Sequence, residues 1–166
     1  MKGTVTATKH FEFAMAHNLP YHDGKCAFIH GHNYGMDITV ARKANNERRK
    51  EDSEYGMVID FKNLNKIVND NIIEKYDHAL VLWDELKSNQ IIVLDQFIEA
   101  HKNDKDLFDD YRIRTVPYRV TVENMCVYFA EELYPVLAKD GIILKKIKIW
   151  ETRDSYAEFE IDENAL

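Results

Sequence analysis

The chain has 166 residues, enough for one domain with a hydrophobic core, and its 45% hydrophobic and 31% charged residues are typical of globular proteins. The formal net charge of −7 argues against nucleic acid as the main partner, because a polyanion requires a basic surface. No apolar run approaches the roughly 18 residues that span a bilayer, and Met1–Val5 lacks the pattern of a secretory leader. We therefore expect a cytoplasmic protein with no membrane partner.

The first half of the chain predicts two strands and a helix. Thr4–Ala16 and Tyr34–Ala41 alternate polar and apolar residues, which predicts strands. Asn18–Ile29 between them is expected to be a loop, and Arg42–Tyr55 after them a charged, solvated tip. Asp60 is a typical N-cap, and apolar residues at helical spacing follow it. This pattern predicts a helix over about Phe61–Glu74.

The second half predicts a longer helix and a closing hairpin. Thr121 caps a helix over about Val122–Leu137, in which Pro135 marks the final turn or a kink. Before this helix, the sequence predicts a short amphipathic helix over Ile91–His101, a charged connection over Lys102–Asp110 and a short strand over Val116–Val120. After it, Ile142–Trp150 and Tyr156–Ile161 are expected to form the two strands of a hairpin. Because strands and helices do not alternate regularly, we expect a single α+β domain over residues 1–166 with an antiparallel sheet.

Three histidines form a candidate metal site. His30 and His32 are separated by Gly31, so on a strand they point to one face, with α-carbons roughly 7 Å apart. That spacing lets two imidazoles converge on one ion, with His17 joining them from the preceding strand. Three neutral imidazoles suit zinc and leave a fourth position open. Alternatively, His-Gly-His is a turn with two solvated side chains.

The two cysteines are too few for a disulfide framework. Cys126 lies in an apolar helical pattern and is expected to be a small buried residue. Cys26 lies beside the histidines, where three interpretations are open from spacing alone: a catalytic thiolate, a fourth zinc ligand or an inert buried thiol.

Ordered motifs around the histidines resemble a known family. They are Phe13-Ala-x-Ala-His17, Cys26-x3-His30-Gly31-His32-Asn33-Tyr34, Gly56-Met57-Val58-Ile59-Asp60-Phe61, Tyr76-Asp77-His78-Ala79-Leu80, Thr121-x-Glu123-Asn124 and Trp150-Glu151-Thr152-x-x-Ser155-x-Ala157. Together they resemble the 6-pyruvoyl-tetrahydropterin synthase and 6-carboxytetrahydropterin synthase family. They cover most of the chain outside a longer variable segment at about residues 84–115, to which we assign no catalytic residue.

The resemblance implies a fold and a set of catalytic roles. The expected fold is the tunnelling fold, a four-stranded antiparallel sheet with two helices on one face, assembled into homo-oligomers, commonly hexamers built as dimers of trimers. The resemblance makes the three histidines zinc ligands and Cys26 the general base. It also makes Asp77 and His78 a second proton-transfer pair, with Asp77 orienting the ring. Adjacent residues on a strand face opposite ways, so this pair can interact directly only in a turn or bent backbone; otherwise it is a solvated pair after a helix.

The resemblance also implies residues that bind the substrate, 7,8-dihydroneopterin triphosphate. Glu151 would anchor the pterin by accepting N–H donors from its aminopyrimidine edge; the alternative is an exposed glutamate at a strand end. Thr121 and Glu123 either contact the pterin or only cap the helix and begin its first turn. The family often has threonine where this chain has Val122, which weakens the case for a hydroxyl contact there. Candidate cations for the triphosphate are His22, Lys25 and Arg153 near the motifs, and Arg48 and Arg49 in the charged tip, and the sequence gives no preference among them.

The family divides by product. One branch eliminates triphosphate and forms 6-pyruvoyltetrahydropterin. The other also cleaves a carbon–carbon bond, releases acetaldehyde and forms 6-carboxytetrahydropterin, a precursor of queuosine and other deazapurines. The Cys26-x3-His30 spacing resembles the second branch, which we therefore expect. The alternatives are the pyruvoyl branch, a non-catalytic zinc- or pterin-binding protein, and a hydrolase that uses zinc-bound hydroxide.

Overall fold

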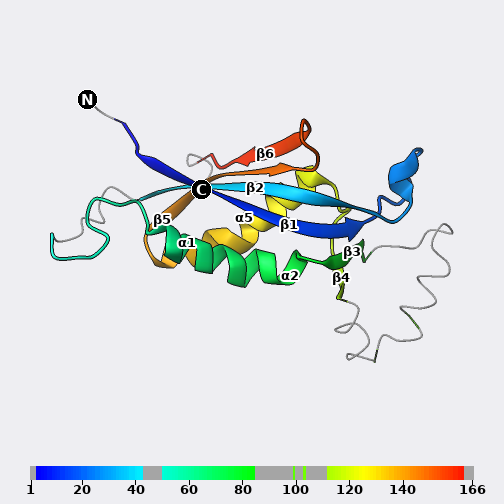
Figure 1. The fold of residues 1–166 in the computed structure, drawn as a ribbon, viewed down its shortest axis with the longest axis horizontal. Helices are drawn as coiled ribbons and strands as arrows, with labels where there is room; N and C mark the ends of the chain where they lie inside the picture. Colours follow the sequence, from blue (N-terminus) through cyan, green and yellow to red (C-terminus); the bar gives the residue numbers. More distant parts are fainter. Residues whose placement is uncertain (1–2, 43–49, 85–98, 100–102, 104–111, 163–166) are drawn as a thin grey trace.

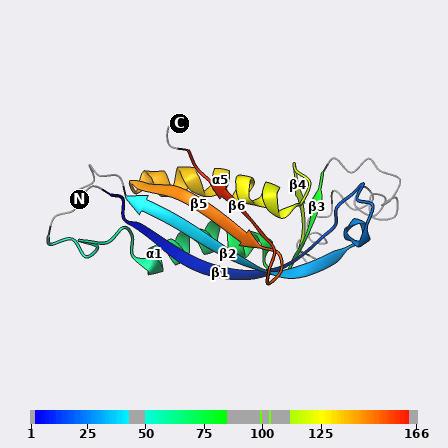
Figure 2. The same ribbon diagram turned by 90° about the horizontal axis from the view of Figure 1, so that it is seen from above.

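A curved sheet forms the centre of the fold. The computed structural model describes residues 3–42, 50–84, 99, 103 and 112–162. Within them, six strands form one mixed sheet in the order β4-β3-β1-β2-β5-β6. Figure 1 shows the helices on one face of this sheet, and Figure 2 shows how β1 and β2 bend along their length. The fold is therefore α+β, as the sequence predicts.

The two long central strands pair along their whole length. β1 (Thr6–His17) and β2 (His30–Arg42) are antiparallel, from Thr6 opposite Ala41 to His17 opposite His30. Alternate side chains of both strands are buried against the helices; these are Phe11, Phe13, Met15, His17, Tyr34, Met36, Ile38 and Val40. Both strands extend further toward the histidines than expected, so the histidines themselves are strand residues.

Two further strands continue the antiparallel part of the sheet. β5 (Ile142–Trp150) pairs with β2, with a register shift between Thr39 and Val40, and β6 (Tyr156–Glu160) pairs with β5. The predicted closing hairpin is confirmed. Gly141 precedes β5 with a φ of 70°, a left-handed conformation that glycine adopts without strain.

Two helical segments cover one face of the sheet. The first contains α1 (Phe61–Val68), a π-helical segment (Asn69–Ile73) and α2 (Glu74–Tyr76); its buried residues are Leu64, Val68, Ile72 and Tyr76. The second, α5 (Val122–Lys139), buries Met125, Cys126, Phe129, Ala130, Leu133 and Leu137. The predicted caps are confirmed, because Asp60 accepts a hydrogen bond from the Lys62 N–H and Thr121 accepts one from the Asn124 N–H. Pro135 does not end α5, which continues to Lys139.

The expectation of a four-stranded antiparallel sheet is wrong in two respects. β3 (Ala79–Trp83) pairs in parallel with β1, and β4 (Ile113–Val116) pairs in parallel with β3, so the sheet has six strands and is mixed. The parallel pairing is possible because the first helical segment carries the chain back along the sheet before β3 begins.

The strand predicted over Val116–Val120 is also wrong. β4 ends at Val116, because Pro117 follows it and has no N–H to donate to a neighbouring strand. The predictions for Ile91–His101 and Lys102–Asp110 lie outside the described residues, except at Glu99 and Asn103. In the described part of the chain, no helix has both the length and the apolar character needed to cross a membrane.

Candidate active site and metal centre

The adjoining ends of β1 and β2 bring the three histidines together. His17 lies opposite His30, and His32 lies opposite Met15, so all three side chains fall on the buried face of this strand pair. The ring centroids are 4.6 Å apart for His17 and His30, 5.5 Å for His17 and His32, and 5.0 Å for His30 and His32. One ring nitrogen of each lies within 4.8 Å of the others, the arrangement of a three-imidazole metal site.

Two backbone carbonyls determine which nitrogen these rings present. His17 Nδ1 lies 2.7 Å from the Val120 carbonyl oxygen, and His30 Nδ1 lies 2.8 Å from that of Phe28. A carbonyl only accepts, so each Nδ1 carries the proton and donates it. The Nε2 lone pairs of His17 and His30 remain available for a metal, as in sites where an outer hydrogen bond fixes the ring of a ligand. The donor set therefore fits zinc.

Burial favours the neutral form of His17 and His32, because it lowers the pKa of both. Desolvation is the main cause that lowers the pKa of His17 from its ordinary value of 6.5 to about 4, and His30 and His32 add to the effect, while the Val120 hydrogen bond opposes it. Desolvation also lowers the pKa of His32, against the attraction of Glu151. Because metals bind neutral imidazole, these shifts favour binding at neutral pH.

Two oxygen-bearing side chains lie beside the cluster. The hydroxyl of Tyr34 is 3.2 Å from His17 Nε2, and its ring is buried and stacked on Phe13. A carboxylate oxygen of Glu151 lies 3.7 Å from His17 Nε2 and 3.8 Å from His32 Nε2. Glu151 follows the last residue of β5, where its backbone N–H bonds to the Ser155 carbonyl. Glu151 thus lies beside the histidine cluster and is not an isolated surface residue.

Cys26 lies in the loop that joins β1 to β2. It is half-buried within a single 3-10 turn (Lys25–Ala27), and its carbonyl accepts a hydrogen bond of 2.8 Å from the Leu19 N–H. The group of ligating atoms within 4.8 Å of one another, among the described residues, contains the three histidines and not the Cys26 thiol. This geometry gives no support to Cys26 as a fourth zinc ligand. Cys126, in contrast, is buried in α5, which raises the pKa of its thiol to about 12.

Asp77 and His78 do interact, because they lie in a turn. Asp77 follows α2 in an extended conformation, and His78 has a φ of 59°. His78 Nδ1 lies 2.9 Å from one carboxylate oxygen of Asp77, while the other accepts a 2.8 Å hydrogen bond from the Ala14 N–H. Partial burial acts to raise the pKa of Asp77, but the hydrogen bonds from Ala14 and His78 and the charges of His78 and Arg112 outweigh it and lower that pKa.

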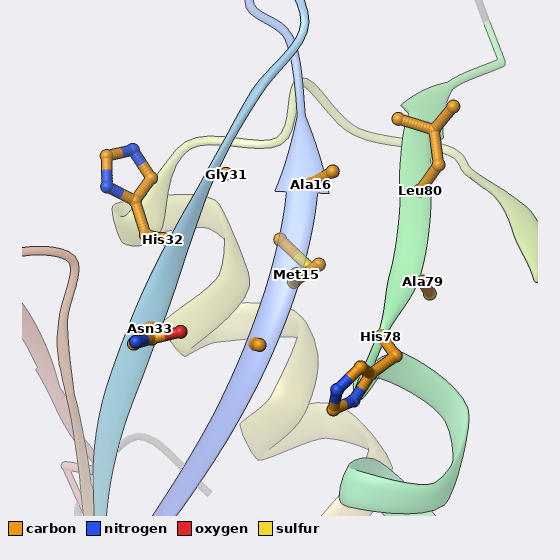
Figure 3. A pocket seen from close by; sticks show the side chains of 9 residues that line it. Met15, Ala16, Gly31, His32, Asn33, His78, Ala79 and Leu80 are labelled. Atoms are coloured by element: carbon orange, nitrogen blue, oxygen red, sulfur yellow. The ribbon is translucent and has the colours of Figure 1, made fainter.

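The turn does not meet the histidine cluster within one chain. A cavity of about 510 Å³ lies over β1, β2 and β3, with Asn33 and His78 contributing to its lining. Figure 3 views it from the face opposite α5, and the rings of His32 and His78 lie on either side of β1 without converging. The structure therefore brings His17, His30, His32 and Glu151 together and leaves His78 apart.

The start of α5 lies next to the histidine cluster. Val120, which holds His17, immediately precedes Thr121, whose hydroxyl caps the helix at 3.4 Å from the Asn124 N–H. Glu123 is exposed in the first turn. The capping interpretation of Thr121 is observed directly. Of the candidate cations, His22 accepts a hydrogen bond from the Gly24 N–H within its own loop, and Lys25 and Arg153 are exposed.

Sequence reasoning missed three contributors to this region. Tyr34 could have been found, since it lies two residues beyond His32 and so faces the same way. The Val120 carbonyl could not, because a backbone acceptor leaves no trace in residue identity. Arg112, which lies beside Asp77 and His78 in a second cavity, belongs to the variable segment and matches no motif.

Comparisons with known proteins identify the family. The family model described as 6-pyruvoyl tetrahydropterin synthase matches residues 6–162. Two relatives are named 6-carboxy-5,6,7,8-tetrahydropterin synthase. The one from Haemophilus influenzae is 30% identical, over 92% of this chain and 96% of that protein. The one from Rickettsia bellii is 29% identical, over 93% of this chain and 99% of that protein.

Solved structures show the same fold. An uncharacterized protein from Wolinella succinogenes has a TM-score of 0.73 at 18% identity, covering 97% of this chain and 100% of that one. The 6-pyruvoyl tetrahydropterin synthase of Caenorhabditis elegans has a TM-score of 0.61 at 22% identity, covering 96% and 97%. With the family model matching nearly its whole length, the chain belongs to the 6-pyruvoyl tetrahydropterin synthase family.

Proposed function

We propose that this protein is a zinc-dependent 6-carboxytetrahydropterin synthase. It would convert 7,8-dihydroneopterin triphosphate and one water to 6-carboxy-5,6,7,8-tetrahydropterin, acetaldehyde and triphosphate, in the pathway to queuosine or another deazapurine. The observation that carries the proposal is the group of three histidine nitrogens within 4.8 Å, in a chain whose relatives of that name match it over most of its length.

The three histidines would hold zinc through Nε2 of His17 and His30 and a ring nitrogen of His32. Bound there, zinc would supply Lewis acidity to the side-chain oxygen of the pterin on which negative charge develops. The backbone carbonyls of Val120 and Phe28 keep two of the rings in the tautomer this requires. Glu151 lies near enough to direct the substrate at this centre, and we retain it as the anchor of the aminopyrimidine edge.

The chain's own acid–base groups would move the protons. Cys26, in the loop between the two ligand-bearing strands, would remove a proton from carbon. His78 would exchange a proton through Nε2, because Asp77 takes up Nδ1. Thr121 and Glu123, at the start of α5, would line the pterin end of the site.

The separation of His78 from the cluster favours a site shared between subunits. A homo-oligomer, by family resemblance a dimer of trimers, would place Asp77 and His78 of one subunit against the histidines and Cys26 of the next. The cavity over β1, β2 and β3, which His78 lines, would then face a neighbouring subunit.

Product analysis tests this function. Purified protein loaded with zinc and given 7,8-dihydroneopterin triphosphate should release acetaldehyde in a 1:1 ratio with the carboxypterin. Triphosphate release with 6-pyruvoyltetrahydropterin and no acetaldehyde would establish the other branch. Binding of the pterin without turnover would establish a binding protein, and turnover of simple esters or phosphates without a pterin would establish a hydrolase.

A further inference from the structure

The Asp77–His78 turn is fixed to β1 on one side. The Ala14 N–H donates to the Asp77 carboxylate at 2.8 Å, and the Ala14 carbonyl accepts from the His78 N–H at 2.6 Å. The Asp77 carboxylate thus accepts the hydrogen bond that a backbone carbonyl would accept in a strand pair. It does so one residue before Met15 of β1, where the pairing with Ala79 of β3 begins. This pair of bonds locates the carboxylate on the β1 side, and on the other side of the turn the Asp77 N–H donates a 2.8 Å hydrogen bond to the Ile73 carbonyl.

Arg112 supports that other side. Its guanidinium donates a 2.8 Å hydrogen bond to the Glu74 carbonyl in α2, and its own carbonyl accepts a 3.1 Å hydrogen bond from the Leu80 N–H in β3. Arg112 therefore joins the element before the turn to the element after it. Both His78 and Arg112 adopt a left-handed conformation, with φ of 59° and 48°. Such backbones persist in non-glycine residues when the surrounding contacts determine them.

A cavity of about 180 Å³ lies between these groups. Its lining comprises Ile73, Glu74, Asp77, His78 and Arg112. The charged and titratable groups that face Asp77 there are thus Glu74 at the end of the helical segment, His78 in the turn and Arg112 before β4. Arg112 is the permanent cation of this set, and its charge contributes to lowering the pKa of Asp77.

We propose that Arg112 is a positioning residue of the Asp77–His78 pair. Its guanidinium holds the Glu74 carbonyl in the last turn of the first helical segment and supplies the positive charge facing Asp77, so that Asp77 holds His78 by Nδ1 and directs Nε2 to the substrate. The proposal rests on the proposed function for its catalytic consequence, since it assigns His78 the proton transfer. Arg112 would then be a residue of the variable segment, at about residues 84–115, that orients a catalytic side chain.

The alternative is a purely structural Arg112 that caps a helix end. Two substitutions separate the roles, because Arg112→Gln keeps an N–H donor for the Glu74 carbonyl without the charge, and Arg112→Lys keeps the charge. Lys62→Gln, at an exposed position of α1, removes the same charge away from the turn.

The test combines carbon NMR of the Asp77 carboxylate, proton–nitrogen NMR of the His78 ring and steady-state kinetics on the zinc-loaded enzyme. We expect Arg112→Gln to raise the pKa of Asp77, weaken the His78 Nδ1–H signal and lower kcat by up to about 100-fold, with unchanged zinc content and Tm. Arg112→Lys should restore most of both the pKa and kcat, and Lys62→Gln should match the wild type.

Wild-type behaviour of Arg112→Gln in the Asp77 pKa and in kcat would overturn the proposal, as would equal losses in the Gln and Lys variants with a lowered Tm. The two levels of inference fail separately. If the wild-type protein does not turn over the pterin, the proposed function fails, while the NMR signals of Asp77 and His78 still decide whether Arg112 positions the pair.

Discussion

The hydroxyl oxygen of Tyr34 lies 3.2 Å from Nε2 of His17, the nitrogen that a metal would occupy. Because His17 donates from Nδ1 to Val120, its Nε2 can only accept, and Tyr34 must be the donor. The hydroxyl and the metal therefore compete for one lone pair. Burial and the nearby charge of Glu151 raise the pKa of Tyr34, so the phenol keeps its proton.

We predict that Tyr34→Phe binds zinc more tightly than the wild type. Metal binding must break the Tyr34–His17 hydrogen bond, and a net contribution of about 0.5–1.5 kcal/mol corresponds to roughly a 2- to 10-fold change in Kd. Competition with a chromogenic chelator measures it. Tyr76→Phe is the matched control, because that buried hydroxyl contacts Tyr118 and Glu132 instead of a histidine. Weaker zinc binding by Tyr34→Phe would show that the hydroxyl supports the metal and does not compete with it.

The metal-free protein should lose stability as the pH falls from 6.5 to 4. Burial lowers the pKa of His17 to about 4, whereas in the unfolded chain it returns to the ordinary value of 6.5. Between these values the unfolded state binds the extra proton, so the free energy of unfolding decreases by about 3 kcal/mol over the window.

Urea unfolding in a chelator at several pH values measures this dependence. His17→Leu, which does not titrate, should show a flatter profile between pH 4 and 6.5, while the loss at lower pH that comes from Asp77 should remain. An unchanged slope in His17→Leu would mean that another group carries the effect.

Mixed oligomers should recover activity from two inactive variants. Cys26→Ala and His78→Ala should each lose about 100-fold or more in kcat, the usual contribution of an acid–base group. If each site combines Cys26 of one subunit with His78 of another, co-refolding equal amounts restores about one site in four. Separately refolded and then combined samples are the control. Recovery in neither sample would place all catalytic groups of a site in one chain.

Gly31→Ala should disturb the metal centre through the backbone. A Cβ at this position would lie 3.0 Å from the Met15 carbonyl oxygen, at the end of the β1–β2 pairing where Gly31 lies opposite Ala16. We expect a loss of about 1–3 kcal/mol in the free energy of unfolding and weaker zinc binding, because His30 and His32 move with β2. Gly3→Ala has no atom within 4 Å to meet and should leave both quantities unchanged. Equal zinc affinity in Gly31→Ala would show that the strand ends can separate freely.

The sequence allowed a correct prediction of those parts of the fold in which local chemistry and tertiary structure agree. Asp60 and Thr121 cap helices because their short polar side chains satisfy free N–H groups, whatever the helix packs against. The alternation in β1, β2, β5 and β6 predicts strands because one face of each strand is more buried than the other. The family assignment is confirmed over residues 6–162.

β3 was missed for the opposite reason. Its sequence Ala-Leu-Val-Leu-Trp has no alternation, because its residues are buried or half-buried on both faces. Such a run has the same appearance as a buried helical segment. In the candidate site, the sequence predicted that His17 joins His30 and His32 from the preceding strand, but only the register shows that His17 lies directly opposite His30. The pairing of Asp77 with His78 depended on the left-handed backbone of His78, which its sequence does not signal.

Because His17 lies directly opposite His30, binding of a metal by the three histidines would depend on the register in which β1 and β2 pair. If β1 and β2 paired one residue out of step, the side chains of one strand would turn to the other face of the sheet, and the three nitrogens could not meet. Zinc present during folding would therefore stabilise only correctly aligned chains.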